Sequence, residues 1–126
     1  ISTVQITHAT PAGVIAHSTS RYGFDGIATE MILDSPLDVL LGAGHPEYDN
    51  DGKKRPEDKP VCKFLGTKAL WEKIRDGKTD AGWTFIETRE QFEKIAADPS
   101  AAPERLLGIA QVGYTLQCYR SGEAMG

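Results

Sequence analysis

The sequence predicts an α/β fold, and three observations lead to this prediction. Segments that alternate apolar with small or polar residues, as strands do, stand between segments whose apolar residues recur every three or four positions, as in helices. Threonines and glycines that suit helix ends stand at the junctions. The chain has 126 residues, 40% of them hydrophobic and 25% charged, which is enough for one globular domain with a modest core.

The first strand is predicted over residues 2–7, where β-branched residues alternate with small or polar ones. Thr10 is a natural N-cap for a helix that begins at Pro11, because proline already has a helical φ and has no N–H to leave unpaired. Helical spacing from Val14 places Arg21 about two turns later, on roughly the same side of this helix.

His8, Thr10 and Arg21 are the candidate site residues of this unit. His8 and Thr10 follow the carboxyl end of a predicted strand, which is where open α/β sheets bind ligands. A structural alternative accounts for the same residues: Thr10 only caps the helix, His8 is a solvated loop residue, and Arg21 pairs with Asp25 on the surface. Spacing by itself leaves both interpretations open.

Further elements follow in order along the first half of the chain. An amphipathic helix is predicted over residues 26–34, with three apolar side chains turned inward: Ile27, Met31 and Ile32. Residues 38–42 read as a short buried strand that glycines terminate, and residues 43–61 as a polar loop with several prolines.

In the second half, Thr67 is predicted to cap a helix that ends at Gly77, with an apolar face of Ala69, Leu70 and Ile74. Residues 83–86 form a strand, and Thr88 with Gln91 forms the capping box of a helix that runs to residue 97. After a proline-containing turn over residues 98–103, the last strand covers residues 106–109.

Charge and hydropathy argue against two kinds of partner. A net charge of −4 disfavours nucleic acid, and the basic run Lys53-Lys54-Arg55 is surrounded by four carboxylates: Asp49, Asp51, Glu57 and Asp58. The sequence contains no apolar run of 18 residues and no signal-peptide pattern, so neither a membrane span nor a leader is expected.

Two weaker patterns occur in the middle of the chain. Glu47, Asp49, Asp51 and Gly52 resemble half of a calcium loop, but Asp58 stands at the twelfth position and prolines prevent a following helix, so a solvated loop is the preferred interpretation. Cys62 and Cys118 make an even count, which allows one disulfide without requiring it.

Residues 1–12, together with Ala16-His17 and Ser20-Arg21, resemble the alkaline phosphatase family, whose chains carry a (D/H)-A-T-P-A segment, then A-H, then an arginine. Residues 33–44 are similar to the family's D-V-(I/L)-x-G-G-G segment, and residues 106–109 to its L-L-G-(L/I)-F segment. The resemblance implies a partial αβα sandwich in which residues 1–44 belong to the core. Residues 45–105 would form a variable insertion or cap-like α/β region, and residues 106–126 a return strand towards the core.

The resemblance also implies roles for single residues. Thr10 stands at the threonine that binds the octahedral magnesium, and His8 stands at a nearby position that is aspartate or histidine in the family. A histidine there puts the usual Mg²⁺ preference in question, because imidazole favours Zn²⁺ or Co²⁺. Arg21 stands at the arginine that clamps the substrate phosphate with its planar guanidinium. His17 stands at a histidine interpreted as structural.

Two parts of the family's chemistry are missing from this sequence. The serine nucleophile segment D-S-A-(A/G)-(S/T)-A-T is absent, and the three histidines have no partners at zinc-ligand spacing. Because the chain also begins inside a predicted strand without Met, we expect an interior piece of a larger metal-dependent phosphomonoester hydrolase, inactive when isolated. The parent would use Zn²⁺ and Mg²⁺ on phosphate monoesters.

The resemblance extends to partners and location. It implies contact with the remainder of the phosphatase chain, a homodimer of the parent, and a periplasmic or extracellular location in which a Cys62–Cys118 disulfide would be favoured. The alternative class is a non-catalytic α/β interaction or structural module. The parent's full reading frame would distinguish the two.

Overall fold

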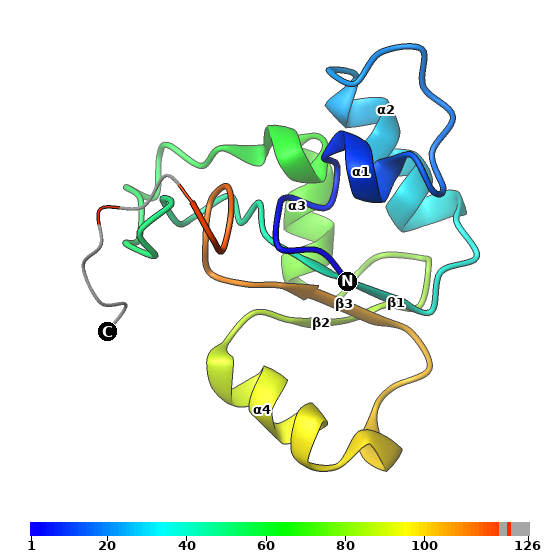
Figure 1. The fold of residues 1–126 in the computed structure, drawn as a ribbon, viewed down its shortest axis with the longest axis vertical. Helices are drawn as coiled ribbons and strands as arrows, with labels where there is room; N and C mark the ends of the chain where they lie inside the picture. The colour runs from blue at the N-terminus through cyan, green and yellow to red at the C-terminus, as the bar shows by residue number, and fades with distance from the viewer. Residues whose placement is uncertain (119–120, 122–126) are drawn as a thin grey trace.

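A parallel three-stranded sheet forms the centre of the structure (Figure 1). The structure is a computed structural model, and it describes residues 1–118 and 121. The strands are β1 (Val39–Gly42), β2 (Thr84–Ile86) and β3 (Leu106–Ile109), in the order β1-β3-β2. All three lie within one residue of their predicted bounds, so the α/β prediction is confirmed.

The predicted strand over residues 2–7 runs along the outer edge of β1 without reaching regular strand geometry throughout. Ser2 N donates to Leu41 O at 2.8 Å, and Ala43 N donates to Val4 O at 3.0 Å. The bridge between Gln5 and Ala43 is parallel, as expected for another strand of the same sheet. This segment therefore ends at the same edge of the sheet as β1.

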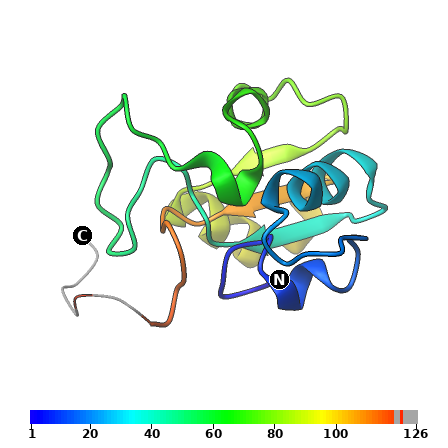
Figure 2. The same cartoon turned by 90° about the horizontal axis from the view of Figure 1, so that it is seen from above.

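Helices cover both faces of the sheet. Figures 1 and 2 place α1 (Ala9–Ala12), α2 (Phe24–Thr29) and α3 (Lys68–Arg75) on one face and α4 (Arg89–Ala97) on the other. The chain continues from α2 into a π-helical turn (Glu30–Asp34), so the helix predicted over residues 26–34 is confirmed. Short 3₁₀ turns precede α3 (Cys62–Leu65) and follow α4 (Pro99–Ala101).

The two longest helices begin at the predicted caps. Thr67 accepts a hydrogen bond from Leu70 N at 3.2 Å, and Thr88 forms the predicted capping box with Gln91. Trp71 takes the buried place on α3 that the sequence assigned to Ala69, which is exposed. Tryptophan buries far more apolar surface than alanine at this position.

The predicted helix from Pro11 to Arg21 is wrong. α1 is a single turn that ends at Gly13, and its N-cap is His8 rather than Thr10. Beyond it, the Ser18 hydroxyl donates to Ser20 O at 2.8 Å and accepts from Ser20 N at 3.3 Å. Serine side chains that bond their own backbone in this way compete with the helical ladder and favour turns.

The segment predicted as an insertion shares the sheet with the predicted core. β2 belongs to residues 45–105, yet it pairs with β3, which in turn pairs with β1. The division into 1–44, 45–105 and 106–126 stays a prediction, and residues 119–120 and 122–126 of its last part lie outside the described residues. In the described part of the chain, no helix has the length and apolarity that a membrane span needs.

The structure bears on the cysteine pair and on the segment that resembles half of a calcium loop. Cys62 and Cys118 are free thiols, so the disulfide that their even count allows is not formed in this structure. The Asp49 carboxylate accepts hydrogen bonds from the backbone N–H groups of Asp51 and Lys53, both at 2.9 Å, which accounts for its place in the loop without calcium.

Candidate functional site

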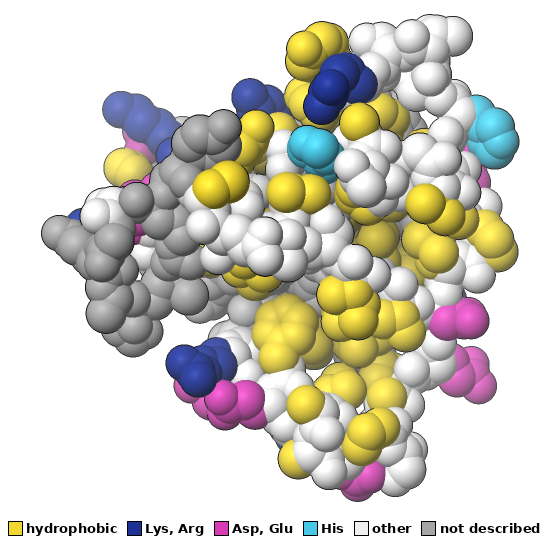
Figure 3. Space-filling view, viewed as in Figure 1, with side chains coloured by type: hydrophobic (Ala, Val, Ile, Leu, Met, Phe, Trp, Pro, Cys, Tyr) yellow, Lys and Arg dark blue, Asp and Glu magenta, His cyan; other side chains and the backbone are white. Residues whose placement is uncertain are grey.

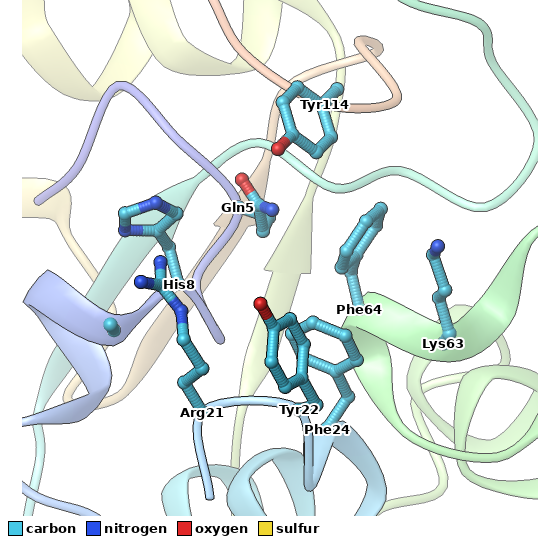
Figure 4. Close-up of a pocket in the computed structure, with 9 residues that line it drawn as sticks. Gln5, His8, Arg21, Tyr22, Phe24, Lys63, Phe64 and Tyr114 are labelled. Carbon is cyan, nitrogen blue, oxygen red and sulfur yellow. The ribbon is translucent and has the colours of Figure 1, made fainter.

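A pocket of about 390 Å³ opens between α1, the turn before α2 and the 3₁₀ turn that precedes α3 (Figure 4). Two cations line it, and no aspartate or glutamate does. We call it the Arg21 pocket; its lining residues are Gln5, His8, Ala9, Arg21, Tyr22, Phe24, Lys63, Phe64 and Tyr114. The corresponding region of the surface shows cationic and histidine side chains beside hydrophobic ones (Figure 3).

Arg21 reaches this pocket from a series of tight turns. Tyr22 N donates to the Ser20 hydroxyl at 3.2 Å, and the guanidinium carbon of Arg21 lies 5.9 Å from the centre of the Tyr22 ring. Arg21 forms no ion pair with a carboxylate of the described residues, so the predicted alternative of a surface pair with Asp25 is wrong. Its five N–H donors are thus available to an anion.

His8 lies at the start of α1, partly buried at the wall of the Arg21 pocket. Its Nδ1 accepts a long hydrogen bond of 3.4 Å from Thr10 N. In the neutral imidazole this arrangement puts the proton on Nε2, which is then a hydrogen-bond donor. A donor of this kind suits a phosphate oxygen or a metal-bound water.

Thr10 lies elsewhere. It is exposed and lines a separate, largely apolar groove of about 290 Å³ with Ile1, Pro11 and Val14 among others. Two residues along a helix correspond to roughly half a turn, so Thr10 and His8 lie on different sides of α1. The structure therefore brings His8 and Arg21 to one pocket and leaves Thr10 outside it.

The residues present do not complete a magnesium site. Mg²⁺ prefers six oxygen ligands in octahedral geometry, whereas Thr10 and His8 offer one hydroxyl and one imidazole. Within residues 1–118 and 121, no group of three His, Cys, Asp or Glu side chains is arranged to hold a metal ion. The set of metal ligands is therefore incomplete in this part of the chain.

The other two histidines form pairs with glutamates. His17 Nδ1 lies 2.5 Å from Glu30 Oε1 on the surface, and this hydrogen bond lowers the pKa of Glu30. His45 is buried, and its Nε2 lies 2.6 Å from Glu87 Oε2, a hydrogen bond that lowers the pKa of Glu87. Neither histidine lines the Arg21 pocket.

Sequence reasoning missed several residues of the pocket. Gln5 is 2% exposed, and its Oε1 has no hydrogen-bond partner in the described part of the chain. Lys63, Phe64 and Tyr114 come from segments with no recognisable motif. A local pattern could not have found them, because only the fold brings positions 5, 63 and 114 together.

Most of the chain matches the model of one family. The sequence profile described as alkaline phosphatase matches residues 1–120. The chain belongs to the alkaline phosphatase family. The resemblance drawn from residues 1–21 is thereby confirmed, and so is a fold that forms part of an alkaline phosphatase-like α/β structure.

Two relatives of the family illustrate the extent of the match. The repressible alkaline phosphatase of Saccharomyces cerevisiae is 27% identical over 99 residues, which make up 75% of this chain and 17% of that protein. The crystal structure of the cold-active alkaline phosphatase from the psychrophile Shewanella sp. matches with a TM-score of 0.56 and 26% identity, covering 89% of this chain and 21% of that one. This chain spans about a fifth of the length of the alkaline phosphatases it matches.

Proposed function

We propose that this chain contributes the phosphate-binding arginine, Arg21, to an alkaline phosphatase that hydrolyses phosphate monoesters. The supporting observation is that Arg21 has no carboxylate partner in the described residues and lines a pocket without acidic side chains, together with His8. A planar guanidinium can hold two phosphate oxygens, and the Nε2–H of neutral His8 can donate to a third.

The remaining chemistry belongs to residues that this sequence does not contain. A phosphatase of this family needs a serine nucleophile and zinc, and the magnesium ligands other than His8 would come from outside the described residues. We expect a periplasmic or extracellular location for the parent. The chain by itself is expected to give no metal-dependent turnover of an aryl phosphate when Zn²⁺ and Mg²⁺ are added.

Titration of inorganic phosphate into the 126-residue chain tests the proposal directly. We expect weak binding that Arg21→Ala reduces several-fold and Arg21→Lys restores only in part, since lysine has no planar fork. Arg89→Ala is the matched control, because Arg89 is an exposed arginine on α4 whose partner is Glu93. Equal affinities of the Arg21→Ala and Arg89→Ala variants would refute the role of Arg21.

A non-catalytic interaction module is the second candidate. It would predict phosphate affinity that is insensitive to Arg21, and no loss of activity when Arg21→Ala is introduced into the longer phosphatase. In that longer protein, our proposal predicts that Arg21→Ala mainly raises KM for the phosphate ester.

A further inference from the structure

The Arg21 pocket has an aromatic wall that phosphate binding does not require. Four rings meet edge to face in a continuous row: Tyr22 and Phe24 at 6.4 Å, Phe24 and Phe64 at 5.3 Å, and Phe64 and Tyr114 at 5.7 Å between centroids. Figure 4 shows Tyr22, Phe24 and Phe64 between Arg21 and Lys63, with Tyr114 above them in the view. The row is far larger than one anion needs.

Part of this wall is open to solvent. Tyr22 is 75% exposed and Tyr114 is 40% exposed, although both are large side chains with apolar ring faces. Phe64, in contrast, is buried and fixes the row against the 3₁₀ turn (Cys62–Leu65). Exposed ring faces on a rigid aromatic base are suited to stacking with another flat, apolar group.

The charges around the wall indicate the sign of the ligand. Arg21 lies 5.9 Å from the Tyr22 ring, and Lys63 Nζ lies 4.9 Å from the Phe64 ring. No carboxylate lines the pocket, although the whole chain carries a net charge of −4. The site therefore favours anions over cations that would compete for the same ring faces.

Gln5 supplies a further polar contact. It lies beside His8 and Tyr114 in Figure 4, is 2% exposed, and its amide oxygen has no partner among the described residues. An amide oxygen is an acceptor, so a donor such as a bound water would satisfy it, and the oxygens of an anion would not. The pocket thus combines cations, ring faces and one unsatisfied amide.

We propose that the Arg21 pocket is an aryl phosphate subsite, in which Arg21 binds the phosphate and the Tyr22–Phe24 edge of the aromatic wall stacks against the aromatic ring of the ester. This inference rests on the proposed function, because the phosphate must be held by Arg21. A phosphate at that guanidinium places the ester's organic group beside the Tyr22 ring. Aryl monoesters therefore bind better than equally large saturated ones.

Phenyl phosphate and cyclohexyl phosphate are the matched probes, since both carry a six-membered ring and one phosphate. Calorimetric titration of the chain should give a two- to tenfold higher affinity for the phenyl ester. Tyr22→Leu and Phe24→Leu should reduce this ratio towards one. Phe92→Leu is the control, because Phe92 is a partly buried phenylalanine of α4 that contacts Gly108 instead of this pocket.

A measurement on the unaltered chain covers the case in which a variant fails to fold. Nuclear Overhauser effects between the phenyl protons of the ligand and the Tyr22 or Phe24 ring protons support the subsite, and their absence at saturating ligand overturns it. Equal affinities for the two esters, with phosphate binding still dependent on Arg21, would overturn the aryl subsite and leave the proposed function standing. Phosphate binding that is independent of Arg21 would overturn both.

Discussion

Residues 1–23 and residues 62–109 of this chain are held in place by different means. The second region contains α3, β2, α4 and β3, whose helices begin at threonine caps and whose central strand is buried at all four positions. The first region has a single helical turn with a 3.4 Å cap, and Ile1, Val14 and Tyr22 are each at least 75% exposed. It is held by backbone hydrogen bonds to β1 and by Ile6 and Ala12, which are buried in the core.

The comparison teaches that the regular scaffold and the two predicted site residues, His8 and Arg21, lie in different parts of the molecule, although Lys63 and Phe64 of the second region also line the pocket. Buried apolar side chains of the sheet, α2, the π-helical turn and α3 form most of the hydrophobic core. His8 and Arg21, in contrast, lie in turns whose side chains are free to contact a ligand. Side chains on irregular segments over a rigid scaffold are a common arrangement for binding sites.

The largest expected effect follows from removing a core side chain of the scaffold. Leu107 lies in the central strand and is completely buried, so Leu107→Ala should lower the free energy of unfolding by about 2–5 kcal/mol. Val14→Ala, at a position that is 79% exposed in the first region, should change it by less than about 0.5 kcal/mol. Urea unfolding measures both free energies, and similar decreases in the two variants would contradict the difference between the two regions.

A smaller effect is expected at the junction between the regions. A Cβ on Gly42 would lie 2.8 Å from Ile6 Cγ2 and 2.9 Å from Val4 O, so Gly42→Ala should cost about 1–3 kcal/mol and weaken phosphate binding by displacing residues 2–8. Gly26→Ala is the control, because a Cβ at Gly26 in α2 meets nothing within 4 Å and alanine is the better helix former. Unchanged phosphate affinity in Gly42→Ala would show that the site does not depend on this junction.

The smallest effect concerns the two histidine–glutamate pairs and appears only in acid. Each pair holds the pKa of its glutamate below 4.5, so the stability it contributes is present above about pH 4.5 and is lost as the pH falls through the lowered pKa. His45 is buried and His17 is 89% exposed, so the contribution of Glu87 should exceed that of Glu30.

Urea midpoints between pH 7 and pH 3 separate the two pairs. Glu87→Gln should flatten the loss of stability on acidification more than Glu30→Gln does, because solvent screens the surface pair. A larger effect of Glu30→Gln would mean that the exposed His17–Glu30 pair contributes more to stability in acid than the buried His45–Glu87 pair.

Local signals in the sequence were sufficient for the scaffold. The threonine caps at Thr67 and Thr88 and the apolar runs of the strands depend on neighbouring residues only, and they were predicted within one residue or two. The segment near Ser18 and Ser20 was mispredicted as helix because these serines form turns through side chain–backbone hydrogen bonds, which helical spacing of apolar residues does not register.

The candidate site was predictable only in part. His8 and Arg21 were found by their motif, and the fold brings both to one pocket. Gln5, Phe64 and Tyr114 meet them through contacts between residues far apart in the chain, so no spacing rule points to them. The separation of Thr10 from His8 depends on where α1 begins, one of the least reliable features of a sequence-based prediction.

The order of the strands in the sheet has a consequence for how the chain assembles during synthesis. β3 is the last of the three named strands to emerge from the ribosome, and among these three it alone pairs with both of the others. Until residue 109 has been made, β1 and β2 have no hydrogen-bonding partner in each other, and their apolar edges are open to wrong pairings. Parallel strands joined by long crossovers form slowly because the intervening chain must be ordered first. The sheet beneath the Arg21 pocket therefore forms only when β3 has been made and pairs with β1 on one side and β2 on the other.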